Sequence, residues 1–382
     1  MVIAATLLAG CVPGALVPTP SPAASATRST APEPSTAPTP TPSPQATPVL
    51  LATLAASDGL AIVDPDARAP VLDVVTVGRA PWGVAATADT AFVATAEGLA
   101  VVDLASRERT ALVPYLHDAQ LHPPGSDAFG EYRDGGLGIA VSPDGARVYV
   151  AVHRWPDPAW LEVFDVELGA FAGSADVGVR PFDVLADPEG AWVATVDHDS
   201  CTVSLVDTAT LAVEQVEIAP FGNFGFAGWE KPHYAALTDD DRIALPYQGL
   251  VTVLLDPGTG ETERVEASAN SHQHGVATAP DGRLVSAGTG PFGTATGGTN
   301  VSFLDPSDGD EVVVPLAHPH ETVAIWQPEG DGGWEAVLAG GFTRDGWWDG
   351  LTLVDPSGSI REVPLEGRPQ HVISATLPAV AP

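Results

Sequence analysis

The sequence has few cysteines, few basic residues and no long apolar run, and each shortage excludes something. Cys11 and Cys201 are the only cysteines among 382 residues. Because Cys11 is better explained as a lipidation site (below), no intrachain disulfide is expected. The fold must then be held by an apolar core, which a chain of this length can supply. No apolar stretch approaches the roughly 20 residues of a membrane-spanning helix.

Basic residues are scarce as well: 16 lysines and arginines stand against 49 acidic residues, a formal net charge of −33. Lys231 is the only lysine. Such a surface repels nucleic acid and anionic lipid and concentrates cations around the molecule. We therefore expect no nucleic-acid partner, and a protein that stays soluble in a salt-rich or calcium-rich exterior.

The first 48 residues differ in composition from the rest. The stretch MVIAATLLAGC resembles a bacterial lipoprotein signal, in which the cysteine, here Cys11, becomes the lipidated first residue. Residues 12–48 are rich in Pro, Ser, Thr and Ala, which cannot bury a core and stay extended. We expect residues 1–11 to be the signal and 12–48 a disordered tether. The protein is then extracytoplasmic and held on the cell membrane by its lipid anchor.

A repeat dominates the remaining sequence. Seven short apolar runs end in aspartate, such as LAIVD, LEVFD and LTLVD, at spacings of 39 to 62 residues. Asp-Gly turns and further strand-like runs separate them. About four strands in each repeat indicate the blades of a propeller, an all-β fold that hides its sheet edges by closing into a ring. The prediction is a seven-bladed β-propeller of four-stranded antiparallel blades over residues 49–378, followed by a tail at 379–382.

The two ends of this region complement each other. The last strand, His371–Thr376, has no partner strands after it, and the first three strands have no innermost strand before them. We expect these ends to share one blade, with His371–Thr376 pairing with Leu50–Ala56. A ring closed in this way is expected to be monomeric.

The repeat also carries a family resemblance. GIAVSPDGARVYVAVH and RPFDVLADPEGAWVATVDHDSCTVSLVDTATL resemble YVTN-type β-propeller repeats, a superfamily with lactonase-like and surface-layer-associated members. The resemblance implies the propeller fold over about residues 49–378. Because propellers host many activities, it implies little about function.

All ten histidines fall in connections that should share one face of the propeller. Strand starts in consecutive blades line the mouth of the central channel, and imidazole is the commonest ligand of zinc and copper. HQH and HPH place paired rings on the same side of an extended segment, and Cys201 offers a soft ligand beside His198. The expected ligands are His233, His274, His320 and His371, supplemented by His272, His318, His198 and His153.

Three functions remain open. One is a zinc or copper carrier or sensor with a metal-transport or cell-surface protein as partner; HQHGVATAPDGRL resembles strand starts of exported zinc metallochaperones with a propeller fold. A second is a metal-assisted lactonase or lyase at the same mouth, with His320 and Glu321 as an acid/base pair. A third is a non-catalytic surface module that binds protein or glycan, for which Trp347 and Trp348 could stack on a ligand.

Overall fold

The computed structural model describes residues 46–117, 133–153, 157–218, 231–247, 251–267, 275–288, 298–328, 333–341 and 346–379. Within these residues the chain forms 28 β-strands and no helix. None of the described residues therefore belongs to a helix long and apolar enough to cross a membrane. The strands are grouped into seven four-stranded antiparallel sheets, the blades.

From the innermost strand outward, the first three blades are β4 (Val84–Ala86), β5 (Thr90–Ala94), β6 (Leu99–Asp103), β7 (Glu108–Val113); β8 (Gly135–Val141), β9 (Arg147–His153), β10 (Trp160–Asp165), β11 (Ala170–Asp176); and β12 (Pro181–Ala186), β13 (Trp192–Asp197), β14 (Thr202–Asp207), β15 (Val213–Glu217). Blades 4 to 6 are β16 (Ala236–Leu237), β17 (Ile243–Tyr247), β18 (Val251–Leu255), β19 (Thr262–Glu266); β20 (Val276–Thr278), β21 (Leu284–Gly288), β22 (Asn300–Leu304), β23 (Glu311–Pro315); and β24 (Thr322–Trp326), β25 (Glu335–Ala339), β26 (Gly350–Val354), β27 (Ile360–Pro364).

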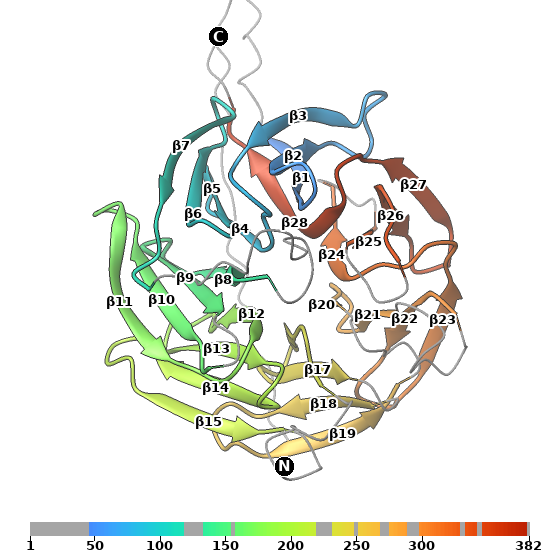
Figure 1. The fold of residues 1–382 in the computed structure, drawn as a ribbon. Helices are drawn as coiled ribbons and strands as arrows, with labels where there is room; N and C mark the ends of the chain where they lie inside the picture. The colour runs from blue at the N-terminus through green and yellow to red at the C-terminus, as the bar shows by residue number, and fades with distance from the viewer. Residues whose placement is uncertain are drawn as a thin grey trace, which may run out of the picture. The chain divides into compact units, whose positions relative to one another are not determined.

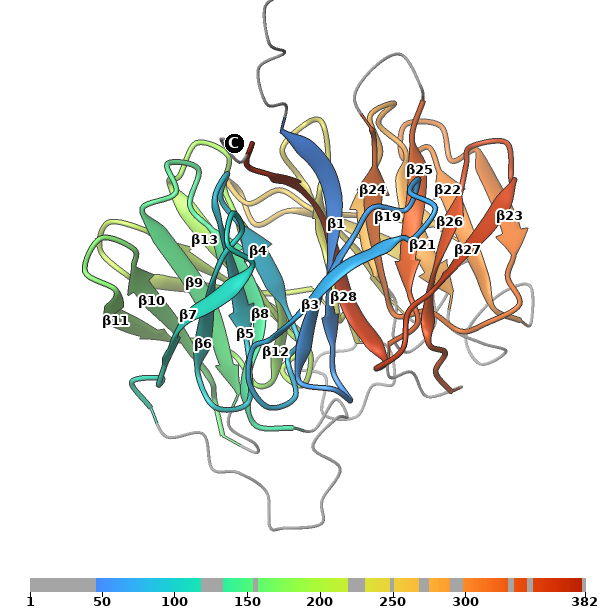
Figure 2. The ribbon, with the colours of Figure 1, turned by 90° about the horizontal axis from the view of Figure 1, so that it is seen from above.

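Blade 7 combines strands from both ends of the described chain: β28 (Pro369–Leu377), β1 (Thr47–Leu54), β2 (Gly59–Val63) and β3 (Val71–Thr76). β28 pairs antiparallel with β1, with Leu50 opposite Ser374. Figure 1 shows the seven sheets arranged in a ring with β28 next to β1, and Figure 2 shows the same pair from above. The predicted all-β fold of seven four-stranded blades is confirmed.

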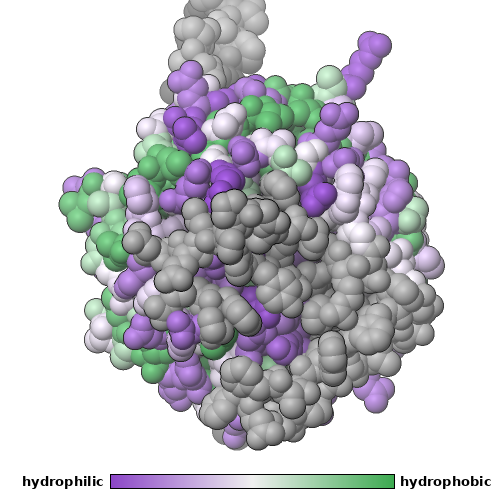
Figure 3. Space-filling model, viewed as in Figure 1, coloured by the Kyte–Doolittle hydropathy of each residue, from purple (hydrophilic) through white to green (hydrophobic). Residues whose placement is uncertain are grey.

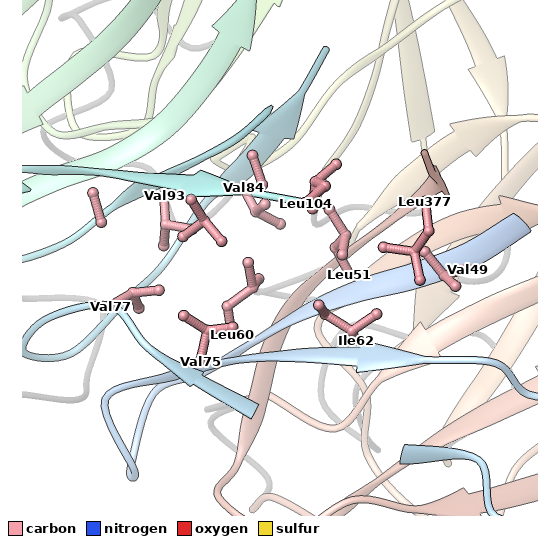
Figure 4. Close-up of a cluster of buried hydrophobic side chains, with 13 residues drawn as sticks. Val49, Leu51, Leu60, Ile62, Val75, Val77, Val84, Val93, Leu104 and Leu377 are labelled. Carbon is pink, nitrogen blue, oxygen red and sulfur yellow. The ribbon is translucent and has the colours of Figure 1, made fainter. Parts of the chain in front are cut away.

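The core lies between neighbouring blades, which explains why the inner strands are apolar at consecutive positions. Successive side chains of a strand point to opposite faces of the sheet. In β1, Leu51 packs with Val93 of blade 1, in the cluster drawn in Figure 4, whereas Leu50 packs with Val337 of blade 6. Both faces are therefore buried. Each fully buried leucine or valine contributes roughly 1.5–3 kcal/mol.

The aspartates that end the repeated runs cap the following turn. In each of the seven, Oδ1 accepts a hydrogen bond of 2.6–3.0 Å from a backbone N–H two or three residues further on. Asp207 is typical, accepting from Thr210. An aspartate side chain can bond to the backbone ahead of it and so stabilise a tight turn. The repeated Asp is therefore a structural feature of the hairpin between the third and fourth strands.

The outer surface carries isolated apolar side chains on the outermost strands of four different blades: Val74, Val213, Val312 and Ile360. Figure 3 shows hydrophilic residues with small hydrophobic areas between them on the described part of one face. Single exposed apolar residues of this kind are ordinary on a soluble protein.

Candidate functional site

The innermost strands approach one another closely where they begin, and glycines make this possible. A side-chain carbon at Gly138 would lie 2.6 Å from backbone atoms of Asp183, and one at Gly275 would lie 2.5 Å from Cα of Thr322. Backbone would have to move to relieve such contacts. The strands line an open cavity of about 250 Å³, the axial cavity, to which each of the seven blades contributes lining residues.

The axial cavity has a largely apolar wall. Four of its described lining residues carry polar side chains, namely Asp183, Tyr234, Thr322 and His371. Asp183 accepts backbone hydrogen bonds from Ala235 (3.0 Å) and Val184 (2.9 Å). Burial nevertheless raises the pKa of Asp183 to about 7 and lowers the pKa of His371 to about 4. Both groups therefore favour their neutral forms more than they would in water.

Tyr234, Glu321 and Gln370 form a hydrogen-bonded bridge between blades 4, 6 and 7 beside the axial cavity. The Tyr234 hydroxyl donates to Glu321 Oε1 (2.6 Å), and Gln370 Nε2 donates to Glu321 Oε2 (2.5 Å). Glu321 has no exposed surface. Burial and the neighbouring Glu321 hold the pKa of Tyr234 well above its usual value. The phenol therefore stays protonated and remains a donor to the carboxylate.

The corresponding positions in blades 1 to 3 are apolar. Trp82, Leu137 and Phe182 form a fully buried cluster, in which the Trp82 and Phe182 ring centroids are 6.1 Å apart. The Arg133 guanidinium lies 5.6 Å from the centroid of the Trp82 ring. Trp82 also lies beside Tyr234, so this apolar cluster adjoins the polar bridge.

Two buried histidines meet beside Phe182, and we call them the histidine pair. His198 begins the turn between β13 and β14, and His233 precedes β16. Their ring centroids are 4.2 Å apart, and Phe182 lies 5.3 Å from the first and 4.5 Å from the second. Burial, together with the nearby His233, lowers the pKa of His198 well below its usual value. Both rings are positioned by packing between blades 3 and 4.

Asp199 orients His198, the first ring of the histidine pair. Its Oδ1 lies 2.9 Å from His198 Nδ1 and accepts from Lys231 Nζ at 2.8 Å, while Oδ2 accepts from Arg180 Nε at 2.7 Å. Burial opposes ionisation of Asp199, but the hydrogen bond from His198, the charge of Arg180 and the hydrogen bond from Lys231 outweigh it and hold its pKa well below the usual range. With His198 Nδ1 donating to this carboxylate, the neutral ring carries its acceptor lone pair on Nε2.

His320 and Glu321 make contacts in different directions. His320 Nε2 bonds to Thr352 Oγ1 (2.8 Å) on β26, inside blade 6, whereas Glu321 reaches residues of blades 4 and 7. Adjacent strand residues point to opposite sides. Burial, and secondarily the nearby His318, lowers the pKa of His320 to about 3. His233 and Tyr234 are likewise adjacent in sequence with side chains in different places: His233 belongs to the histidine pair, and Tyr234 lines the axial cavity.

The remaining predicted residues are distributed over other blades or lie outside the described residues. His371 lines the axial cavity, His153 is buried at the end of β9, and His318 stacks on Trp348 with ring centroids 4.4 Å apart. Trp347 is exposed, with the Arg368 guanidinium 4.6 Å from its ring. Cys201 is buried in the β13–β14 turn. Outside the described residues lie Cys11, His272 and His274.

Within the described ranges, no group of three or more histidine, cysteine or acidic side chains has the spacing to hold a metal ion. Asp183, Tyr234, Gln370 and Asp199 were not among the residues predicted from the sequence. Asp183 could have been found, because it is the one charged residue inside the otherwise apolar strand segment PFDVLA. Lys231, the only lysine, was noted without a role.

Comparison with solved structures supports the propeller class. The chain is similar to hydrazine synthase from Kuenenia stuttgartiensis (TM-score 0.58, 16% identity, covering 77% of this chain and 89% of that one). It is also similar to a functionally unknown protein from Desulfotomaculum acetoxidans (0.60, 11%, 86% and 98%) and to the dihydro-heme d1 dehydrogenase NirN in complex with DHE (0.55, 14%, 83% and 63%). At these identities the likeness concerns the fold alone. No protein-family model and no curated protein sequence matches the chain.

Proposed function

We propose that this protein is an exported, lipid-tethered propeller of the YVTN type that binds a transition metal ion, zinc or copper, through histidines at one mouth of its channel. The observation that carries the proposal is the histidine pair. His198 and His233 are buried, their ring centroids are 4.2 Å apart, and Asp199 accepts from His198 Nδ1. A carboxylate behind a ligating histidine fixes its tautomer and its orientation, a common arrangement at metal sites.

The surroundings of the pair support this assignment in two further ways. Phe182 contacts both rings, so their orientations are held by packing, and the strongly acidic chain raises the local concentration of cations. Arg180 and Lys231 contribute positive charge nearby, but both hydrogen-bond to Asp199. Two imidazoles do not complete a zinc or copper site, which usually has three or four protein ligands. Further donors are assigned to other predicted histidines, His274 and His272 first, then His153. His371, which lines the axial cavity, is not among them.

Zinc and copper titration of variants tests the proposal. A His198→Ala, His233→Ala double variant should bind zinc and copper at least about tenfold more weakly than the parent, because the two rings that nucleate the site are gone. The matched control is His117→Ala, which removes a histidine stacked on Trp160 and bonded to Glu162, outside the proposed ligand set. Equal affinity of the double variant and the parent, in protein with an unchanged circular dichroism spectrum, would rule out this site.

The same proposal predicts a location and a partner for the protein. A lipid on Cys11 followed by the tether of residues 12–48 would hold the propeller near the membrane surface. A metal-binding domain held there could pass its ion to a membrane metal-transport protein. A carrier of this kind needs no catalytic residue.

A further inference from the structure

The axial cavity offers a second binding site, chemically unlike the histidine pair. Its volume of about 250 Å³ is much larger than an ion needs, and most of its wall is aliphatic, including Val184, Val323 and Ile373. A pocket with an apolar wall and a few fixed polar groups is typical of a site for a small organic molecule.

The charged group in this wall is acidic. Asp183 is fixed by the backbone N–H groups of Ala235 and Val184, one on each carboxylate oxygen. No lysine or arginine is among the described lining residues, and none of the ion pairs found in the described chain involves Asp183. A second carboxylate, Glu321, lies close by through its hydrogen bond with Tyr234, another residue of the wall. Asp183 is half-buried, and no positive charge of the described residues is paired with it. A cation beside a carboxylate that is partly withdrawn from water offsets the cost of its desolvation.

A second polar group of the cavity also needs a partner. His371 lines the cavity and is partly exposed, and neither of its ring nitrogens makes a hydrogen bond with a described residue; Nδ1 is in addition buried. Buried polar atoms are normally hydrogen-bonded to protein, water or ligand. Tyr234 adds an aromatic ring to the wall, and a ring face attracts organic cations.

We propose that the axial cavity binds a small organic cation: an amine with an aliphatic body and a second polar group. Asp183 is the counter-ion of its nitrogen, the apolar wall contacts the body, and His371 bonds the polar group. The negative surface of the protein favours the approach of such a ligand. This site goes beyond the proposed metal site and shares none of its first ligands, His198 and His233.

Calorimetry on the full-length protein with three five-carbon probes tests the proposal. The probes are 5-aminopentanol, pentane-1,5-diol, which lacks the charge, and pentylamine, which lacks the hydroxyl. We expect one 5-aminopentanol to bind per chain, pentylamine to bind more weakly and the diol not to bind. Asp183→Asn should weaken 5-aminopentanol binding about tenfold or more. Asp176→Asn, an exposed carboxylate on the outermost strand of blade 2, is the matched control and should change nothing.

A second variant separates ligand recognition from folding. His371→Ala should reduce the preference for 5-aminopentanol over pentylamine while leaving pentylamine binding intact, which a loss of structure could not do. Absence of saturable binding of either amine, or equal binding of the diol, would overturn the proposal.

Zinc serves to distinguish this site from the proposed metal site. Asp183→Asn should retain zinc binding, and saturating zinc should leave 5-aminopentanol binding unchanged. Displacement of the amine by zinc, together with loss of zinc binding in Asp183→Asn, would assign the cavity to the metal site instead. The His198→Ala, His233→Ala variant should keep its affinity for the amine. The experiments can therefore refute one proposal while the other stands.

Discussion

At the scale of single residues, the side of the strand on which a residue lies decides its role. His320 and Glu321 are neighbours in sequence, yet the first bonds inside blade 6 and the second joins the bridge across the channel. The sequence could predict that strand starts gather at the channel mouth. It could not predict which of two adjacent residues faces the cavity, because that depends on strand twist and on neighbouring blades. Asp199 and Asp183 each bond a sequence neighbour, but their other partners are distant in sequence: Arg180 and Lys231 for Asp199, and Ala235 for Asp183. Those distant contacts could not be predicted.

Burial of His320 predicts a specific acid sensitivity. Its pKa is about 3 in the folded protein and 6.5 in the unfolded chain, so between these values the unfolded chain binds more protons and stability falls as pH falls. From pH 6.5 to pH 4 this loss is about 3 kcal/mol. His320→Gln should be less stable than the parent at pH 7, and the difference should shrink or reverse by pH 4 in urea unfolding. A constant difference across this range would contradict the account of His320.

At the scale of elements, the repeated features were predictable and the close contacts were not. The apolar runs, their terminal aspartates and the Asp-Gly turns are local signals, and they were sufficient for seven blades of four strands. The approach of innermost strands at Gly138 and Gly275 involves residues of different blades. A sequence shows such a glycine but not the backbone that a side chain would meet.

Gly138→Ala tests how tightly the innermost strands are packed. The new methyl group would lie 2.6 Å from the Asp183 backbone, so β8 and β12 must separate, and we expect a loss of about 1–3 kcal/mol in the free energy of unfolding. Gly298→Ala is the matched control, because nothing lies within 4 Å of its new carbon. Chemical denaturation compares the two variants. Equal free energies of unfolding for the two variants would mean that the innermost strands move apart at lower cost than the structure indicates.

At the scale of the whole molecule, β28 and β1 place both ends of the ring in one blade. The proposed lipid tether precedes β1 in the chain, and Thr47 and Pro48, expected to end the tether, belong to β1. Cys11→Ser removes the acceptor of the lipid. We expect this variant to appear in the culture medium, whereas the parent and Cys201→Ser fractionate with membranes. A Cys11→Ser protein that stays with the membrane would show that another feature holds it there.

The central claim is that the histidine pair belongs to a metal site, and anomalous diffraction from crystals of the metal-loaded protein tests it most directly. Data collected above and below the zinc or copper absorption edge locate the ion without assumptions about its ligands. The account predicts an anomalous peak within about 2.0–2.1 Å of a ring nitrogen of both His198 and His233 for zinc, with Asp199 still bonded to His198 Nδ1. A peak elsewhere, with the two rings unchanged and unliganded, would contradict it.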